Sequence, residues 1–245
     1  MKICIDAGHG GKDSGARYND DTYEAFECDL NLDIAEELAW QLSGTKHTIL
    51  MTRKTDRTLS LTTRAEYANR NNAEIFVSIH CNAAADPDVE GIEVYHFPGS
   101  HKGNTLANHV YNKMVTTFPD HKHRGVKEAN FTVLRKTLMP AVLIECEFLT
   151  NPVQLQFLLN GKNQLLIAKS IKAGIDNHLS KKCKIIILNG SIKIYGSYNE
   201  AERELGIVPK VLSRIYANNI LPYKIKKGKF KGCVVLKVAD GVKKP

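Results

Sequence analysis

Metal-type ligands stand at the ends of predicted strands at several points of this chain. His9 lies in a glycine-rich segment that leaves the first predicted strand, and His80 ends another strand. Glu145 follows a third apolar run, and Glu27 lies just before a predicted amphipathic helix. Two histidines and a carboxylate are a ligand set typical of zinc hydrolases, and a further glutamate is the general base that such a site needs. Together the four residues predict hydrolysis at a zinc ion.

The residues alone leave the carboxylate ligand open. Glu24 lies about one helical turn before Glu27, and four nearby aspartates also offer oxygen atoms: Asp13, Asp20, Asp21 and Asp29. Glu27 has a structural alternative, because a negative charge stabilises the start of a helix. Glu145 has a weaker one, because a buried carboxylate is costly unless a cation lies nearby. A base beside an activated water is the simpler interpretation of Glu145.

The cysteines do not extend the ligand set. The chain has six, spread from Cys4 to Cys233 without a CxxC pair, which fits a reducing compartment better than a disulfide scaffold. Cys28, Cys81 and Cys146 each follow a candidate site residue. Because neighbouring residues of a strand point to opposite faces, Cys81 and Cys146 should face the core if their predecessors face the site. We expect buried apolar thiols rather than metal thiolates.

Strands and helices alternate along residues 1–180, which predicts an α/β fold with a mixed, mostly parallel sheet flanked by helices. The apolar patterns predict strands at residues 2–6, 48–52, 75–79, 91–95 and 140–144, the fourth of them half-exposed. Helical spacing predicts helices at residues 30–42, 61–71, 105–118 and 163–179. Gly44 suits the end of the first helix.

Five ordered segments resemble the zinc-dependent N-acetylmuramoyl-L-alanine amidases of bacteria and their phages. They lie within residues 1–180: Asp6-Ala7-Gly8-His9-Gly10-Gly11, Glu27-Cys28-Asp29-Leu30-Asn31-Leu32, Val77-Ser78-Ile79-His80-Cys81-Asn82-Ala83, Gly91-Ile92-Glu93-Val94-Tyr95, and Pro140-Ala141-Val142-Leu143-Ile144-Glu145 followed by Phe148-Leu149-Thr150-Asn151-Pro152. Any one of these segments is a weak signal. All five in this order and spacing are specific.

The resemblance implies that His9, Glu27 and His80 bind zinc and that Glu145 is the catalytic carboxylate. It places Glu27, rather than Glu24, directly before the helix. The implied reaction is hydrolysis of the amide bond between N-acetylmuramic acid and the L-alanine of the stem peptide. A zinc-bound water is expected to attack, with Glu145 taking its proton and passing it to the leaving amine.

Three further residues follow from the matched motifs. Asn82 and Arg135 stand in motif contexts that imply substrate binding, although ordinary hydrogen bonding accounts for them equally well. Glu147 departs from the family, which usually has a small residue two places after the catalytic glutamate. We expect Glu147 either to point to solvent or to raise the pKa of Glu145 by like-charge repulsion.

Charge divides the chain of 245 residues, whose net charge is +8. Residues 181–245 hold fifteen Lys and Arg against four Asp and Glu, a charge of +11, whereas residues 1–180 hold nineteen against twenty-two, a charge of −3. We therefore expect a catalytic domain at 1–180 and a small basic α+β domain at 181–245. A basic module suits an anionic polymer, such as the cell wall, nucleic acid or a membrane surface, although it can also be a merely soluble surface.

The basic region has its own local signals. Two apolar runs, at residues 185–188 and 192–195, flank Asn189-Gly190, which predicts a β-hairpin. Two short helices are expected at 201–205 and 211–217, on either side of a glycine-containing turn. This part is similar to the modular DNA-binding repeats of phage homing endonucleases. The same arrangement also suits an anionic cell wall.

The chain shows neither a run of about 20 apolar residues, the length of a membrane span, nor an apolar signal-peptide region near Met1. We therefore expect a phage endolysin that stays in the host cytoplasm until it reaches the wall, with an exported host autolysin as the alternative. Two rival functions are a zinc peptidase that cuts within the stem peptide and a DNA-binding protein with an inactive first domain. The complete set of His9, Glu27, His80 and Glu145 argues against the second rival.

Overall fold

The computed structural model describes residues 1–20, 24–179, 183–187, 192–195, 223–224 and 234–240. The chain divides into two compact units, Met1–Ile175 and Asp176–Pro245. The assignment of a catalytic domain to residues 1–180 and a binding domain to 181–245 stays a prediction.

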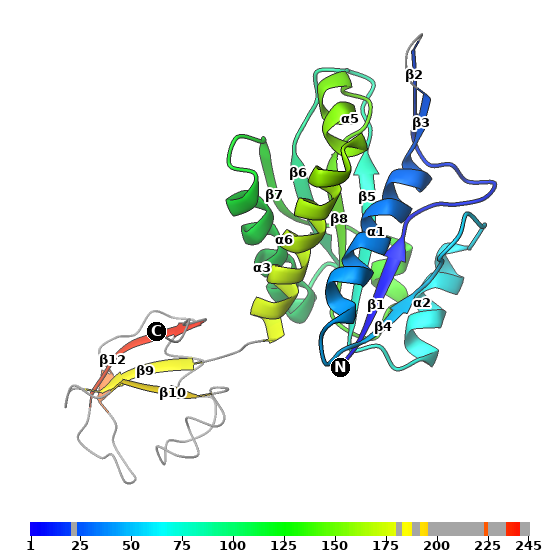
Figure 1. The fold of residues 1–245 in the computed structure, drawn as a ribbon. Helices are drawn as coiled ribbons and strands as arrows, with labels where there is room; N and C mark the ends of the chain where they lie inside the picture. The colour runs from blue at the N-terminus through cyan, green and yellow to red at the C-terminus, as the bar shows by residue number, and fades with distance from the viewer. Residues whose placement is uncertain (21–23, 180–182, 188–191, 196–222, 225–233, 241–245) are drawn as a thin grey trace. The chain divides into compact units, whose positions relative to one another are not determined.

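A six-stranded sheet with the order β4-β1-β5-β8-β6-β7 forms the centre of the first unit (Figure 1). β1, β4, β5 and β8 are parallel to one another, whereas β6 is antiparallel to β8 and parallel to β7. The strands are β1 (Lys2–Ala7), β4 (Thr48–Met51), β5 (Ile75–Asn82), β6 (Ile92–His96), β7 (His123–Glu128) and β8 (Ala141–Phe148). The predicted mixed, mostly parallel sheet is confirmed.

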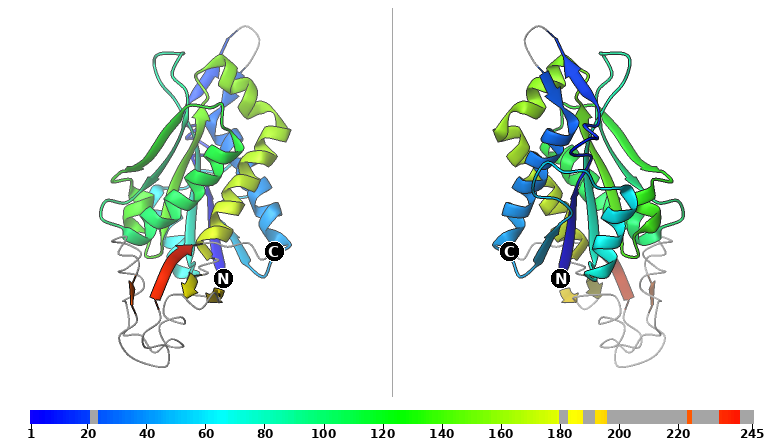
Figure 2. Two further views of the ribbon diagram at one scale, coloured as in Figure 1. Left: turned by 90° about the vertical axis from the view of Figure 1, so that its left-hand side faces the viewer. Right: turned by 90° about the vertical axis from the view of Figure 1, so that its right-hand side faces the viewer.

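Helices cover both faces of this sheet. The helices are α1 (Glu27–Ser43), α2 (Leu61–Arg70), α3 (His101–Thr117), α4 (Thr132–Lys136), α5 (Pro152–Leu159) and α6 (Gly161–Leu179). α1 and α6 lie on one face and α2 on the other (Figure 2). α1 buries Leu30, Ile34 and Leu38, whose four-residue spacing keeps them on one side of a helix. On the other face, Phe76 and Leu143 belong to the same apolar cluster as residues of α2 and α4.

The parallel strands bring the candidate site residues to one edge of the sheet. His9 follows the end of β1, and His80 lies near the end of the neighbouring strand β5. Glu145 is the partner of His80 in the ladder between β5 and β8. Glu27 is the first residue of α1 rather than the residue before it. The short antiparallel pair β2 (Arg17–Asn19) and β3 (Glu24–Phe26) precedes it.

A β-bulge interrupts the ladder just beyond this point. His80 pairs with Glu145, but the next pair is Asn82 with Phe148. One residue of β5 therefore stands opposite two residues of β8. A bulge of this kind changes the direction in which the following side chains point.

Some local predictions differ from the structure. The strand predicted at residues 91–95 is present as β6, but its expected half-exposure is wrong, because four of the five residues of β6 are buried. β7, the β2–β3 pair, α4 and α5 were not predicted. These elements are three to eight residues long, so their patterns cover too few positions to show a period.

The described residues of the second unit include the end of α6 and a sheet with the order β10-β9-β12-β11. β9 (Cys183–Ile187) and β10 (Ile192–Tyr195) form the predicted antiparallel pair, although the turn between them lies outside the described residues. β12 (Val234–Asp240) and β11 (Tyr223–Lys224) were not predicted. The expected helices at 201–205 and 211–217 lie outside the described residues. No helix of the described residues is long and apolar enough to cross a membrane.

Candidate active site and metal centre

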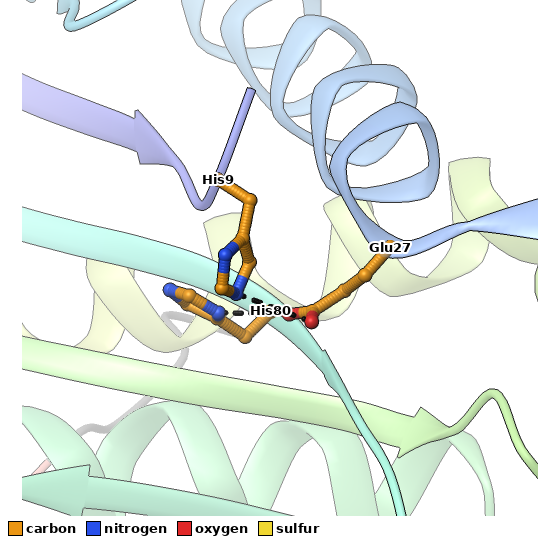
Figure 3. A group of neighbouring side chains, drawn as sticks. All are labelled: His9, Glu27 and His80. Carbon is orange, nitrogen blue, oxygen red and sulfur yellow. Dashed lines mark hydrogen bonds and ion pairs between the residues drawn. The ribbon is translucent and has the colours of Figure 1, made fainter. Parts of the chain in front are cut away.

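The side chains of His9, Glu27 and His80 converge at the edge of the sheet (Figure 3). One ligand atom from each lies within 4.8 Å of the other two. The Glu27 carboxylate stands between the imidazoles, with Oε2 at 3.1 Å from His9 Nε2 and Oε1 at 2.9 Å from His80 Nδ1. The three residues come from a loop, a helix start and a strand, so the fold rather than local sequence brings them together.

The negative charge of Glu27 is stabilised by its neighbours, although only 7% of its side chain is exposed. Burial alone would raise its pKa, but the hydrogen bonds with His80 and His9 outweigh it and hold the pKa far below its ordinary value. The Ala16 and Cys81 backbone N–H groups also donate to its oxygens. Glu27 is therefore an anion held ready to bind a cation.

The loop that carries His9 has an unusual backbone. His9 itself has a φ of 59°, a backbone conformation that residues other than glycine rarely adopt. Its Nδ1 atom lies 2.9 Å from Asp13 Oδ2, which leaves Nε2 facing Glu27. Burial lowers the pKa of His9, but its contacts with Glu27 and Asp13 raise it above the ordinary value. Such a carboxylate partner on the second nitrogen is common for metal-binding histidines.

Two buried arginines fix this loop in place. Arg53 is 1% exposed and donates to the carbonyl oxygens of Ala7 and Gly8, each at 2.9 Å. Arg64 is 2% exposed and donates to the carbonyl oxygens of Ala7 and His9, each at 2.6 Å, and to Asp6 Oδ1 at 2.9 Å. Sequence reasoning missed both arginines, since no motif or period marks them. Their role follows only from the folded geometry.

The three side chains fit a zinc ion. Two imidazole nitrogens and a carboxylate oxygen are a known catalytic zinc ligand set, and here they already converge with the carboxylate ionised. Glu24, the alternative carboxylate, is exposed in β3 and is not part of the cluster. The thiols of Cys28, Cys81 and Cys146 are buried outside the cluster, which confirms their prediction as core residues.

Glu145 lies beside the cluster with a carboxyl group in a different state. Its Oε2 atom is buried and accepts no hydrogen bond from the described residues. Burial, followed by the negative charges of Glu27 and Glu93, raises its pKa well above the ordinary value. A carboxyl group whose pKa is raised holds a proton more readily than an ordinary one, and its place beside the ligand cluster suits it to general acid–base catalysis.

Both expectations for Glu147 are wrong. Its side chain is fully buried rather than solvated, and it accepts hydrogen bonds from the Gly91 N–H at 2.6 Å and the Phe148 N–H at 3.1 Å. Its other oxygen lies 2.8 Å from His121 Nδ1. The charges that raise the pKa of Glu145 are those of Glu27 and Glu93 instead. The bulge in β8 explains this separation, because it alters the regular alternation of side chains.

The two candidate substrate-binding residues lie in different surroundings. Asn82 ends β5 and donates from Nδ2 to Glu93 Oε1 at 2.7 Å, next to Glu145. Arg135 lies in α4 and donates to Asn130 and Thr132. It lines a cavity of about 420 Å³ that also includes Ala141, the first residue of β8. Substrate binding by Asn82 and by Arg135 stays a prediction.

A family model described as N-acetylmuramoyl-L-alanine amidase matches residues 3–177. The crystal structure of an N-acetylmuramoyl-L-alanine amidase from Clostridium difficile 630 is similar, with a TM-score of 0.69 and 39% identity over 73% of this chain and 96% of that chain. The uncharacterised protein YqiI of Bacillus subtilis is 35% identical over 72% of this chain and 84% of its own length. The amidase CwlM of Bacillus licheniformis is 36% identical, and the matched part covers 62% of this chain and 58% of that protein. The family match ends before the basic region, so it gives no support to the resemblance with DNA-binding repeats.

Replacing Gly8 by alanine tests how tightly the loop is packed against the cluster. A Cβ atom on Gly8 would lie 2.3 Å from the His80 ring, so either the ring or the loop must shift and disturb the geometry of the cluster. We expect Gly8→Ala to weaken zinc binding by about 10–100-fold, as changes around metal ligands do, in a competition assay with a zinc chelator. Gly44→Ala is the matched control, because no atom of the described residues lies within 4 Å of its Cβ position. Equal zinc affinity of the two variants would contradict this account of the loop.

Proposed function

Because the chain belongs to the N-acetylmuramoyl-L-alanine amidase family, which hydrolyses amide bonds of peptidoglycan, we propose a specific role for each site residue. His9, Glu27 and His80 bind a zinc ion, and Glu145 is the general acid–base. The bond cleaved joins N-acetylmuramic acid to the L-alanine of the stem peptide. The observation that carries the proposal is the convergence of three ligand atoms within 4.8 Å beside a carboxyl group with a raised pKa.

The chain's own residues divide the work. When bound here, zinc would act as a Lewis acid toward the scissile carbonyl and would lower the pKa of water. His9, Glu27 and His80 hold the ion, and Asp13 keeps the His9 ring oriented. Glu145 accepts the proton of the attacking water and donates a proton to the leaving amine of L-alanine. Asn82 orients the substrate near Glu145.

The rival functions have less support. A peptidase that cuts within the stem peptide would use the same ligand set, but the family match favours the bond next to the sugar. A protein with an inactive first domain would have no need to keep its ligands in place. Mass analysis of digested peptidoglycan separates the two hydrolases, because an amidase releases the N-terminus of L-alanine.

We further propose that residues 181–245 hold the enzyme on an anionic cell-wall polymer. The support is the charge of +11 in this region beside −3 in residues 1–180. Opposite charges concentrate a protein on a polymer surface. The endolysin role, with accumulation in the host cytoplasm before release, is part of the same proposal and is tested by whether lysis of producing cells requires permeabilisation of the membrane.

Removal of the metal tests the ligand assignment. The protein should bind one zinc ion, lose hydrolysis on chelation and recover it when zinc is returned. His80→Ala should lose zinc and activity together, because two side chains rarely retain a catalytic ion. His101→Ala is the control, since His101 is exposed and outside the cluster. Full activity of His80→Ala after chelation would refute the site.

Glu145→Gln separates the base from the ligands. The variant should bind zinc normally but hydrolyse peptidoglycan about 10²–10⁴-fold more slowly, the usual contribution of general acid–base catalysis. Glu36→Gln makes the same change on the exposed side of α1 and should leave the rate unaltered. If Glu145→Gln also releases the metal, Glu145 is a ligand and the roles assigned to the two glutamates are wrong.

Truncation after Leu179 tests the basic region. The shortened chain keeps all four proposed site residues, so it should still cleave soluble muropeptides while losing much of its binding to purified cell walls. Wall binding by the full chain should weaken with salt, because exposed charges are screened beyond about 10 Å at 0.1 M. Sedimentation with walls at two salt concentrations, with and without competing duplex DNA, measures this. Binding to DNA but not to walls would instead identify a nucleic-acid module.

A further inference from the structure

A second buried glutamate lies directly beside Glu145. Glu93 in β6 is 2% exposed and is the partner of Glu145 in the antiparallel ladder between β6 and β8. Residues opposite each other in such a ladder project on the same face of the sheet. Glu93 therefore shares the face that carries the proposed general acid–base, although the amidase reaction as described does not use it.

Four donors surround the Glu93 carboxylate. Asn82 Nδ2 and the Tyr95 hydroxyl donate to Oε1 at 2.7 and 2.8 Å. Arg124 Nε donates to Oε2 at 3.0 Å, and Lys127 Nζ also binds Oε2. Each lone-pair region of the carboxylate is thus occupied. Glu93 is an ionised anchor that orients side chains from β5, β6 and β7.

The cluster carries more positive than negative charge. Among the described residues, Arg124 and Lys127 both form their ion pair with Glu93. One negative charge therefore faces two positive charges. The two cationic side chains are 28% and 37% exposed, whereas Glu93 is buried beneath them. Lys has three donors and Arg has five, so both retain donors for a ligand. The Arg124 guanidinium also lies 4.9 Å from the centre of the Phe148 ring, which restricts its orientation.

The cations of this cluster lie within reach of a stem peptide whose scissile amide is bound at Glu145. Glu145, Glu93 and Gly125 are successive partners across β8, β6 and β7. Neighbouring strands are about 4.8 Å apart, and the side chains of Lys127 and Arg124 reach from β7 to Glu93, which is only one strand away from Glu145. An extended peptide covers about 3.5 Å per residue. A stem peptide whose first amide lies at Glu145 can therefore place its second residue near Lys127 and Arg124.

We propose that Lys127 and Arg124, oriented by Glu93, form a subsite for a carboxylate of the stem peptide close to the cleaved bond. The proposal rests on the amidase function proposed above and adds a substrate preference to it. Hydrogen bonds between a cation and a carboxylate are about twice as strong as neutral ones. The enzyme should therefore prefer a stem peptide whose second residue has a free carboxylate over one in which that group is a carboxamide.

A purely structural network would behave differently. If Arg124 and Lys127 served only to join β7 to β6, removing one cation would affect all substrates alike. A ligand-binding cation instead changes the ratio of rates for substrates that differ in charge at one position. The ratio of kcat/KM values therefore separates the two roles.

The test uses the full chain with zinc and two soluble muropeptides that have the same disaccharide and complete stem. They differ only in a carboxylate or a carboxamide on the second stem residue. We expect the wild type to prefer the carboxylate by about tenfold in kcat/KM, the factor that corresponds to about 1.4 kcal/mol. Lys127→Met should lose most of this preference, because its KM for the carboxylate substrate should rise toward its KM for the carboxamide.

Lys122→Met is the matched control. Lys122 is exposed just before β7, and its substitution removes the same charge without touching Glu93. It should keep the wild-type preference. Equal cleavage of the two muropeptides by the wild type would overturn the subsite alone, and so would a full preference retained by Lys127→Met. If the enzyme cleaves neither the two muropeptides nor purified walls, the amidase function is overturned and the subsite with it.

Discussion

The buried carboxylate of Glu27 is the constraint on which the arrangement of the site depends. An ionised group in this position is costly unless it is surrounded by donors or cations. Here its partners come from three separate parts of the chain: the loop with His9 and Ala16, the first turns of α1, and β5 with His80 and Cys81. The carboxylate therefore joins these three parts to one another at the end of the sheet. Arg53 and Arg64 extend this constraint to the backbone of the His9 loop.

Two neighbouring glutamates show how surroundings divide similar groups into different roles. Glu93 and Glu145 are opposite each other in one ladder, yet Glu93 is surrounded by donors and cations and its pKa is lowered. Glu145 has a buried oxygen without a hydrogen bond from the described residues, and its pKa is raised. The charge of one contributes to the shift of the other. A proton therefore resides more readily on Glu145 than on Glu93, which suits one carboxylate to proton transfer and the other to positioning.

Much of the first unit was predictable because its elements are long and their apolar residues follow a clear period. The four predicted helices and five predicted strands of residues 1–180 are present, and the ordered motifs indicated His9, Glu27, His80 and Glu145 before any contact was known. Contacts between distant residues were not predictable. The hydrogen bonds from Arg53 and Arg64 to the His9 loop, and the cations around Glu93, join residues separated by 31 to 57 positions. The exposure of β6 was predicted wrongly because alternation within one strand does not show which neighbours cover it.

The bulge between β5 and β8 has a consequence for how β8 tolerates change. In an uninterrupted strand, Glu145 and Glu147 would have the same phase and their charges would repel each other. The extra residue shifts the phase after Glu145, so Glu147 instead joins His121 and the Gly91 backbone. Two acidic residues thus stand two positions apart in sequence and have different partners. A deletion of one residue from the bulge would restore the phase and move this second negative charge toward Glu145, whereas most substitutions in the same segment would leave the separation intact.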